Sequence, residues 1–470
     1  MPIMRREEEL LLIPKLGRRG FFKIGATTFM GFHLLPMLSP LQAWAERKVK
    51  PRGTAEFCIF LHLVGGPSQV DTFDLKEGRW TPDDFGIHKI TPEVSMPVGL
   101  LPRLSAKLNH LAIVRSAESW EGIHERGQYY IQAGRAFSPA RVGEIPSVGS
   151  LVAYEFQSRR RESDCLPPFV AMNFTLRGVG LAGQGMLPAS CAPLPLTVEQ
   201  GADVPLVVPK EEQARFADRW KFLQTLDGSS RDGRSVLGRP VDDYTDYYLG
   251  AYQMMKRPEI GDVLRLPEDD HKRYGATGVG DACILARNLV AADAGTHFIM
   301  IAHPGWDLHS KEYDKTQKVN HYTLCREIDA CLGSLLQDLA NTKDKSGRTL
   351  LEKTLIVSMG EFGRTPGPLT HIGGRDHHRF ASVVLFAGGG VKGDRVIGAT
   401  DEIGGKVVRP GWHGGRSVYP EDVVATIYSA LGIDWTKRIQ NTPSGRVFSY
   451  VDGTSASGTI DPDEVSELFV

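Results

Sequence analysis

The sequence is poor in cysteine, with six residues in a chain of 470. That density is far below what a disulfide-stabilised scaffold needs, and no two cysteines have the C-x-x-C spacing of a cysteine zinc site. An excess of basic charge is also missing, because 55 Lys and Arg are balanced by 56 Asp and Glu. A general nucleic-acid-binding protein would need such an excess, so we expect no nucleic-acid partner.

Several common catalytic motifs are absent as well. The chain has no G-x-x-x-x-G-K-[ST] phosphate loop, no G-x-S-x-G elbow and no H-E-x-x-H helix motif. These absences argue against a P-loop enzyme, a serine hydrolase of the α/β-hydrolase type and a zincin protease. What is present is an ordinary globular composition, with 41% apolar and 24% charged residues, so a sizeable core is expected.

The N-terminal segment has the three parts of an export signal in their usual order. The basic pair Arg18-Arg19 precedes an apolar stretch from Ile24 to Leu41, which is followed by the cleavage pattern Ala43-Trp44-Ala45. This order resembles a twin-arginine signal peptide. We therefore expect residues 1–45 to direct the chain to the twin-arginine export machinery and then to be cleaved off, so that the mature chain is periplasmic or secreted. The apolar stretch contains Gly, His and Pro and is a poor membrane span, so none is expected after cleavage. A basic amphipathic helix is the alternative interpretation.

Apolar runs alternate along the rest of the chain with segments of helical periodicity. The runs are typical of buried strands and cover Phe57–Val64, Leu111–Arg115, Phe169–Met172, His297–His303, Thr354–Met359 and Ser382–Ala387. The helical patterns cover Gly122–Ala133, Ser147–Gln157, Asp242–Met255, Asp281–Ala292, Tyr313–Leu339 and Glu421–Leu431. This alternation predicts an α/β domain over residues 46–452, with a mostly parallel central sheet between helices. We expect a helical insertion around 192–270 and a polar tail over 453–470.

Metal-ligating side chains follow three of the predicted strands, where parallel sheets commonly carry their function. Asp307 and His309 lie two residues apart just after one strand, so both side chains can reach one ion. A capping Asp beside a surface His is the alternative. His377 and His378 follow Gly373-Gly374 in a loop, and a solvated polar turn is the alternative there. These residues predict a divalent metal site, with zinc as the first choice and calcium or manganese as alternatives.

Three further segments offer charged or ligating groups. Glu361 could bind a metal or orient a ligand histidine, and Arg364 has the fork geometry that suits an anion, unless the two form an internal ion pair. His124 begins a helical pattern, where it could be a ligand, a general acid or a cap. Because a helix N-terminus disfavours a cation, we expect its imidazole to be neutral. Asp71 belongs to an acidic pair after the first strand.

The motifs LVGGPSQVDTFDLK, HERGQYYIQAGR, GWDLH, GEFGRTP, GRDHH and AGGGVKGDRVIGATDEIG occur in this order. Together they resemble a secreted bacterial family known as domain of unknown function 1501, over about residues 57–431. That family is placed in the alkaline phosphatase and sulfatase superfamily. The resemblance implies an alkaline phosphatase-like three-layer sandwich with metals at the strand ends.

The resemblance also assigns roles to single positions. Sulfatases carry their nucleophile ten residues before the Gly of a closing T-G-R, and here that position is His124, with Arg135 closing the motif. Asp307 and His309 are similar to an Asp and His that bind one metal, and His377 or His378 matches the last ligand His. Glu361 occupies the position at which the relatives carry a metal-binding Asp. The usual ligand Asp of the first strand is missing, and Asp71 is its nearest substitute.

These residues lead to an expected function with one alternative. We expect an exported metal-dependent hydrolase of sulfate or phosphate esters, in which a metal-activated water or His124 attacks. Arg364 or Arg135 would stabilise the leaving oxygens of a small-molecule or polysaccharide ester. Because the usual hydroxyl nucleophile is missing, the alternative is a non-catalytic, metal-containing descendant that binds a carbohydrate or a protein.

Overall fold

An eight-stranded sheet forms the centre of the protein. The computed structural model describes residues 49–470 apart from 175–179, 203, 205, 232–238 and 456–457, so the proposed export signal lies outside the described residues. The strand order is β12-β4-β11-β8-β1-β7-β5-β6. Their bounds, in chain order, are β1 Phe57–Val64, β4 Leu111–Ala117, β5 Phe169–Met172, β6 Leu194–Leu196, β7 Phe298–Pro304, β8 Thr354–Met359, β11 Ser382–Ala387 and β12 Arg395–Ile397.

The sheet is parallel except at one strand. Only the pairs that β11 makes with β4 and β8 are antiparallel. All other neighbouring strands of this sheet pair in parallel. Parallel strands are usually buried on both faces and read as continuous apolar runs, which is the pattern seen at β1 (FCIFLHLV), where all but the last residue are buried. The predicted α/β class with a mostly parallel sheet is confirmed.

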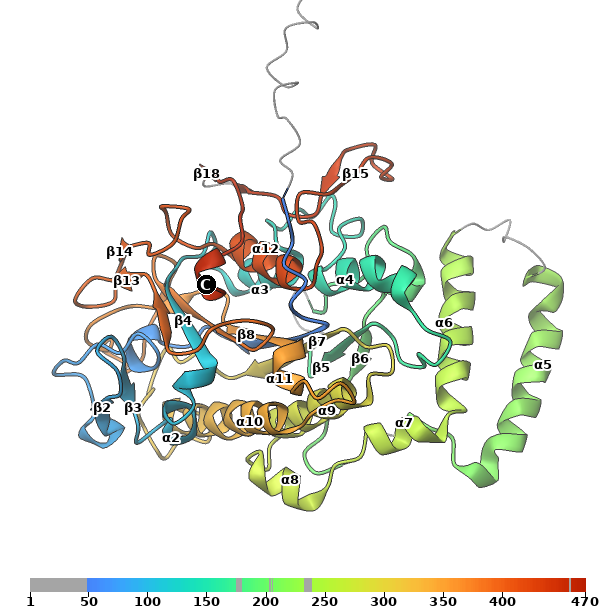
Figure 1. Ribbon diagram of the computed structural model, residues 1–470, viewed down its shortest axis with the longest axis horizontal. Coiled ribbons are helices and arrows are strands. Elements are labelled where there is room, and N and C mark those ends of the chain that lie inside the picture. Colours follow the sequence, from blue (N-terminus) through green and yellow to red (C-terminus); the bar gives the residue numbers. More distant parts are fainter. Residues whose placement is uncertain (1–48, 175–179, 203, 205, 232–238, 456–457) are drawn as a thin grey trace, which may run out of the picture. The chain divides into compact units, whose positions relative to one another are not determined.

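Helices cover both faces of this sheet (Figure 1). One face packs against α9 (Gly278–Ala292) and α10 (His321–Asn341), the other against α3 (His124–Ala133), α4 (Val148–Phe156) and α12 (Pro420–Ala430). The alternation along β1 shows the division, because Ile59 and Leu61 belong to the first core and Cys58 and Phe60 to the second. The result is a three-layer sandwich with two hydrophobic cores.

The expected insertion is mainly helical but begins with a strand. β6 pairs in parallel with β5 at the edge of the sheet. The chain then forms α5 (Gln213–Arg231), α6 (Arg239–Met255), α7 (Pro258–Val263) and α8 (Glu268–Arg273). In Figure 1, α5 and α6 stand at the end of the molecule beyond β6. Within the described residues, no helix has the length and apolar character needed to cross a membrane.

Short elements complete the chain between these layers. The short helices α2 (Pro102–Ser105) and α11 (Leu350–Lys353) pack against α10. Small antiparallel pairs are formed by β2 (Ile87–Lys89) with β3 (Ser95–Pro97), β13 (Ala399–Thr400) with β14 (Val407–Arg409), β15 (Arg438–Ile439) with β16 (Phe448–Ser449), and β17 (Thr454–Ser455) with β18 (Gly458–Thr459). All six cysteines are free thiols.

The C-terminal segment differs from the polar tail expected over 453–470. Val465 and Leu468 are fully buried in the core that contains α12. The amide of Val465 donates a hydrogen bond to Thr426 on α12, and Glu464 accepts two hydrogen bonds from Arg52. Apolar residues spaced among acidic ones therefore anchor this segment, although its average composition is polar.

We expect Leu468→Ala to lower the free energy of unfolding by about 2–5 kcal/mol, because it removes a buried side chain from a packed core. Val470, which is 66% exposed, provides the control, and Val470→Ala should change the free energy by less than about 0.5 kcal/mol. Urea denaturation followed by circular dichroism measures both values. Equal stabilities of the two variants would show that the segment does not pack as described.

Candidate metal centre

Four side chains from three parts of the chain converge at the carboxyl ends of the strands. His124 is the first residue of α3, and Asp307 and His309 follow β7. His377 lies on β10 (His377–His378), which pairs with β9 (Gly363–Arg364) after β8. One ligand atom from each of these four residues lies within 4.8 Å of the others. We call this group the four-residue cluster.

Two glycines allow the loops to meet closely at this point. Gly65, at the end of β1, has a φ of +113°, and a Cβ added to it would lie 2.4 Å from the amide nitrogen of Asp307. A Cβ on Gly374 would lie 2.0 Å from the carbonyl carbon of His309. Side chains at these two positions would push away the loop that carries Asp307 and His309.

Each histidine of the cluster is held through Nδ1 by an acceptor. His124 Nδ1 lies 2.7 Å from Glu361 Oε1, His309 Nδ1 lies 2.8 Å from Asp376 Oδ1, and His377 Nδ1 lies 2.8 Å from the carbonyl oxygen of Gly122. Carboxylate and carbonyl oxygens only accept hydrogen bonds, so each Nδ1 carries the proton. Each Nε2 is then available as a ligand, which is the arrangement typical of histidines that bind metals.

The free nitrogens and one carboxylate oxygen face a common point. His309 Nε2 lies 3.0 Å from His377 Nε2 and 3.0 Å from Asp307 Oδ1. His124 Nε2 lies 3.1 Å from the same oxygen, yet it is buried and has no hydrogen-bond partner. Zinc bonds of 2.0–2.1 Å would place tetrahedral ligand atoms about 3.3 Å apart. The donor set and its spacing therefore fit one divalent metal ion.

The ionisable side chains in and beside the cluster shift one another's pKa values. Burial alone would lower the pKa of His124, but Asp307 and Glu361 raise it to about 9. Burial would raise the pKa of the Asp307 and Glu361 carboxyls, but neighbouring cations lower both values. His124 and Arg364 hold the pKa of Asp307 far below its usual range. His124 and His62 lower the pKa of Glu361 to about 2. In the absence of a metal, the two carboxylates favour a protonated imidazole at His124 over the neutral form expected from the helix N-terminus.

The position of His124 bears on the roles expected for it, namely a metal ligand, a general acid or nucleophile, and a cap. Its ring centroid is 4.2 Å from that of His377, and Nε2 lies among the ligand atoms of the cluster. The N-cap residue of α3 is Ile123, which makes no side-chain capping bond. The geometry favours a ligand over both a cap and a free nucleophile.

Glu361 and Arg364 contact the cluster on its buried side. Glu361 is fully buried, accepts hydrogen bonds from the amide of Gly65, and contacts both His124 and His62. Its carboxylate orients the His124 imidazole, which corresponds to one of the two roles expected for it. Arg364 donates to the carbonyl oxygens of Gly65, Gly66 and Arg375 and to Asp307 Oδ1 at 2.7 Å. Its guanidinium orients Asp307 instead of facing an incoming anion.

Three other residues expected at the site lie elsewhere. Asp71 is buried in an ion pair with Arg375 at 2.7 Å, because the chain after β1 turns through a short 3-10 helix, Gln69–Asp71. His378 points to the opposite side of β10 from His377, as successive strand residues do, and contacts the carbonyl oxygen of Gly405 at 2.6 Å.

Arg135 is also separate from the cluster. It follows the C-terminal end of α3, and at 1.5 Å per residue the helix separates it from His124 by about 14 Å. The guanidinium is buried, donates to the carbonyl oxygens of Ser449 and Tyr450, and lies 4.1 Å from the centroid of the Phe448 ring. Its contacts hold the C-terminal strands.

Two residues of the site were not predicted. Asp376 stands beside His377 in the GRDHH motif, and this adjacency was the available signal. His62 is a lone imidazole in an otherwise apolar strand; its Nε2 lies 3.3 Å from Glu361 Oε2 and its Nδ1 is buried without a partner. A polar residue inside an apolar run was the signal for His62.

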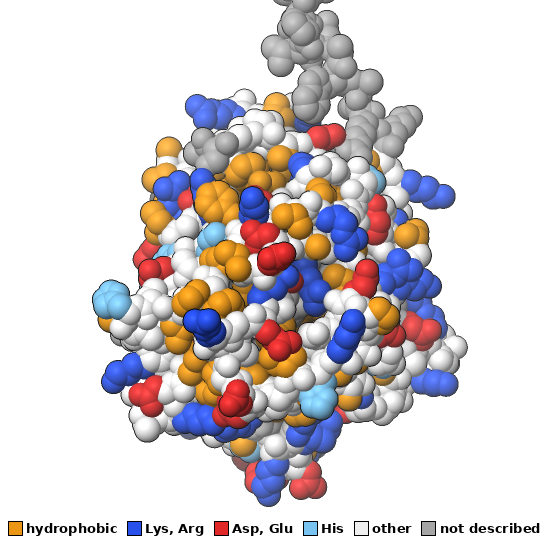
Figure 2. Space-filling model, turned by 90° about the vertical axis from the view of Figure 1, so that its left-hand side faces the viewer, with side chains coloured by type: hydrophobic (Ala, Val, Ile, Leu, Met, Phe, Trp, Pro, Cys, Tyr) orange, Lys and Arg blue, Asp and Glu red, His pale blue; other side chains and the backbone are white. Residues whose placement is uncertain are grey.

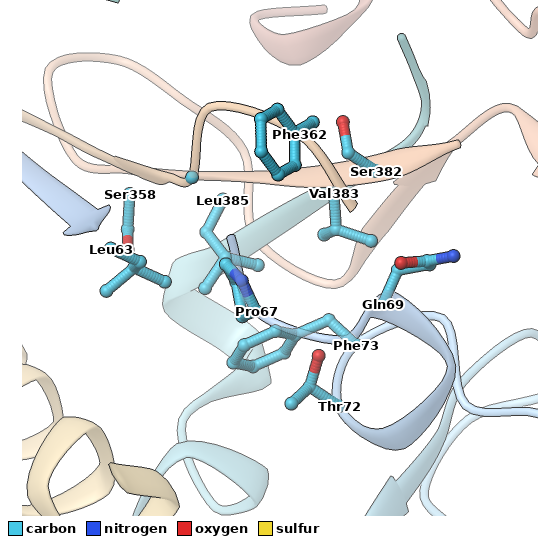
Figure 3. Close-up of a pocket in the computed structure, with 11 residues that line it drawn as sticks. Leu63, Pro67, Gln69, Thr72, Phe73, Ser358, Phe362, Ser382, Val383 and Leu385 are labelled. Carbon is cyan, nitrogen blue, oxygen red and sulfur yellow. The ribbon is translucent and has the colours of Figure 1, made fainter. Parts of the chain in front are cut away.

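Phe362 separates the cluster from the interior. Its ring contacts those of His124 and His377, at 4.9 and 4.6 Å between centroids, and it also lines a cavity of about 10 Å³ (Figure 3). That cavity holds one water molecule at most, so it does not admit a substrate. The other side of the cluster faces the solvent. Asp307 and His309 are 46% and 39% exposed on that side.

Figure 2 shows the face of the molecule that carries β2 and β3, where acidic and basic side chains are mixed with apolar ones.

The chain was compared with known sequences and solved structures. No curated protein sequence matches it. Similar solved structures include a protein of the alkaline phosphatase superfamily from Vibrio parahaemolyticus, with a TM-score of 0.35 and 10% identity over 82% of this chain and 69% of that chain. A phosphonate monoester hydrolase from Silicibacter pomeroyi has a TM-score of 0.34 and 12% identity over 81% and 74%. A putative sulfatase from Bacteroides thetaiotaomicron has a TM-score of 0.34 and 12% identity over 82% and 72%.

A family model described as protein of unknown function (DUF1501) matches residues 55–458. The match includes all four residues of the cluster and both residues that orient its buried side, Glu361 and Arg364. It spans the whole central sheet. The protein therefore belongs to the DUF1501 family.

Proposed function

We propose that this protein is an exported hydrolase of sulfate or phosphate esters that depends on one divalent metal ion. The observation that carries the proposal is the convergence of three Nδ1-anchored imidazoles and one carboxylate on a single point. His124, Asp307, His309 and His377 would hold the ion. When bound, such an ion supplies Lewis acidity to a water molecule or an ester oxygen.

The donor set favours zinc among the three metals considered. Three imidazole nitrogens and one carboxylate oxygen are ordinary zinc ligands, whereas calcium takes six to eight oxygen ligands. Manganese also prefers carboxylate and water oxygens. We therefore propose zinc.

The chain's own residues keep the site ready for a ligand. Glu361, Asp376 and the carbonyl of Gly122 hold each imidazole in one tautomer and one orientation. Arg364 fixes Asp307, and Phe362 closes the interior side. Preorganised groups of this kind need no rearrangement when a substrate arrives from the open side.

Two observations favour the alternative of a non-catalytic, metal-containing protein that binds a carbohydrate or another protein. Arg364, the residue expected to stabilise leaving oxygens, uses its donors on three carbonyl oxygens and Asp307. Position 124, expected to carry a nucleophile, places its imidazole among the metal ligands. An ester hydrolase built here would have to hold its anionic substrate mainly through the metal.

The two functions can be separated by measuring metal content and activity on the same sample. The mature chain, purified without chelator, should contain about one metal ion per chain by mass spectrometry and should hydrolyse aryl sulfate or aryl phosphate esters. His124→Ala should abolish both properties. Stoichiometric metal without hydrolysis of either ester would support the binding protein, and the absence of metal would contradict both functions.

The export signal remains a prediction with a direct test. We expect the double change Arg18→Lys and Arg19→Lys to leave the precursor in the cytoplasm, because lysine keeps the charge but loses the guanidinium fork that a receptor can recognise. The matched control is Arg5→Lys with Arg6→Lys, an arginine pair that precedes glutamates instead of Gly-Phe-Phe. Cell fractionation and N-terminal sequencing report the result. Normal cleavage after Ala45 in the first variant would contradict the prediction.

A further inference from the structure

Two tyrosines and two arginines near the end of α3 carry buried hydrogen-bond donors for which the described residues provide no acceptor. The unpaired atoms are the hydroxyl groups of Tyr129 and Tyr428, Nε of Arg135, and Nε and Nη2 of Arg141. Tyr129, Arg135 and Tyr428 are each 4% exposed or less. Buried polar groups in proteins are almost always hydrogen-bonded, so five such donors together indicate a ligand from outside the chain.

The donors belong to one region of the fold. Arg135 follows Gly134 at the end of α3, and a Cβ added to Gly134 would lie 3.2 Å from Val424 on α12. Tyr428 lies one turn further along α12, on the same side of the helix as Val424. Figure 1 shows α3 and α12 side by side on one face of the sheet. This region is therefore at the opposite end of α3 from His124 and the four-residue cluster.

Electrostatic effects link the tyrosines with the arginines. Burial raises the pKa of Tyr129 to about 12, although the charges of Arg135 and Arg141 act to lower it. Burial also raises the pKa of Tyr428 against the effect of Arg135. Both phenols are therefore protonated at neutral pH and can donate hydrogen bonds.

The nearest carboxylates do not satisfy the arginine donors. Asp452 Oδ2 lies 3.7 Å from Arg135 Nη1, and Glu144 Oε2 lies 3.6 Å from Arg141 Nε. Both distances exceed the range of about 2.7–3.2 Å that is typical of N–H···O hydrogen bonds. The side chain of Asp452 is also 41% exposed, and an ion pair in contact with solvent is weak.

The unpaired donors define the chemistry of the ligand. Guanidinium nitrogens only donate hydrogen bonds, so the ligand must accept them, and two positive charges favour an anion. Nε and Nη2 of Arg141 form the edge of a guanidinium that binds two oxygens of an oxyanion in parallel. Five donors exceed the roughly four acceptor positions of a carboxylate. A tetrahedral oxyanion, with four oxygens, offers enough.

We propose that these four side chains bind a tetrahedral oxyanion, either phosphate or sulfate. The anion would join the end of α3 to α12 and to the segment that carries Arg141. Arg135 would then hold the anion through Nε while its Nη2 continues to hold the carbonyl oxygens of Ser449 and Tyr450. This site is additional to the metal centre and does not depend on the proposed hydrolysis.

Isothermal titration calorimetry of the mature chain with millimolar sodium phosphate and sodium sulfate tests the proposal. We expect at least one of the two anions to bind, and its binding to persist in His309→Ala, which alters only the metal centre. Arg141→Lys keeps the charge but loses the paired N–H edge, and it should weaken this binding at least about tenfold. Arg159→Lys, at an exposed arginine after α4, is the matched control.

Four results of the titrations would overturn the proposal. They are the absence of binding by both anions, binding that Arg141→Lys leaves unchanged, binding that His309→Ala abolishes, and binding of sodium acetate that is equally tight. The first would mean that no oxyanion occupies the site. The second and third would place the anion elsewhere, and the fourth would contradict the choice of a tetrahedral ligand.

The double variant Tyr129→Phe with Tyr428→Phe separates an anion from a structural water molecule. Without added anion it should melt at or above the wild-type temperature, because unpaired buried hydroxyl groups do not stabilise the fold. Phosphate or sulfate should raise the melting temperature of the wild type and of the control Tyr154→Phe, at an exposed tyrosine of α4, more than that of the double variant. An equal rise in all three proteins, which is the general effect of these salts, or a double variant that is less stable without anion, would contradict the proposal.

Discussion

His309→Ala is expected to remove the bound metal and to lower the thermal stability of the protein. His309 contributes one of the converging Nε2 atoms, and it contacts both Asp307 and His377 in the cluster. Metal that binds only the folded chain adds its binding free energy to folding, about 3–4 kcal/mol when the free metal exceeds its dissociation constant 100- to 1,000-fold. Mass spectrometry measures the metal, and differential scanning calorimetry measures the melting temperature in the same buffer.

The matched control for this prediction is His378→Ala. His378 is the neighbouring imidazole on the opposite side of β10 and should be dispensable for metal binding. Chelation should bring the wild type down to the melting temperature of His309→Ala and should have little effect on that variant. Full metal occupancy in His309→Ala would show that the four-residue cluster is not the ligand set.

Glu361→Gln is expected to lower metal affinity by about 10- to 100-fold, although Glu361 is not proposed as a ligand. The carboxylate accepts the Nδ1 proton of His124 at 2.7 Å in a fully buried position. Carboxylates that hold a ligand histidine in this way raise its basicity and fix its ring. Glutamine keeps the shape but removes the charge and one acceptor, so His124 becomes a weaker ligand. Competition with a fluorescent zinc chelator measures the affinity.

Asp376→Asn provides the comparison for that effect. Asp376 holds His309 in the same manner at 2.8 Å, but its side chain is 61% exposed. Solvent water can replace the lost acceptor there, whereas Glu361 is shielded from solvent by its burial, so we expect the smaller loss of affinity in Asp376→Asn. Equal losses in the two variants would mean that burial of Glu361 contributes nothing to metal binding.

The elements with the strongest local signals were predicted closely. Four strands, Phe57–Val64, Phe169–Met172, Thr354–Met359 and Ser382–Ala387, have the predicted bounds, because strands buried inside a sheet are continuous apolar runs. The helix expected from Tyr313 begins only at His321. Its periodic pattern continues upstream, but Asn320 caps the helix and accepts a hydrogen bond from the amide of Thr323, a side-chain bond that apolar periodicity does not report.

Edge strands were missed for a related reason. β6 and β12 have three residues each and pair with only one neighbour. Such short strands depend on the sheet beside them more than on their own sequence. The C-terminal segment shows the same dependence, since its few apolar residues find a core that is formed by distant elements.

The sequence by itself determined the α/β class, the alternation that builds the sheet, the positions of Asp307, His309 and His377 after predicted strands, and the position of His124 at the start of a helix. Only the tertiary structure decided which candidates meet. Strand alternation turns His377 toward the cluster and His378 away from it, the loop after β1 commits Asp71 to Arg375, and carbonyl oxygens from two loops occupy Arg364. A ligand set depends on directions and distances between residues remote in sequence, and local patterns of residue type do not contain them.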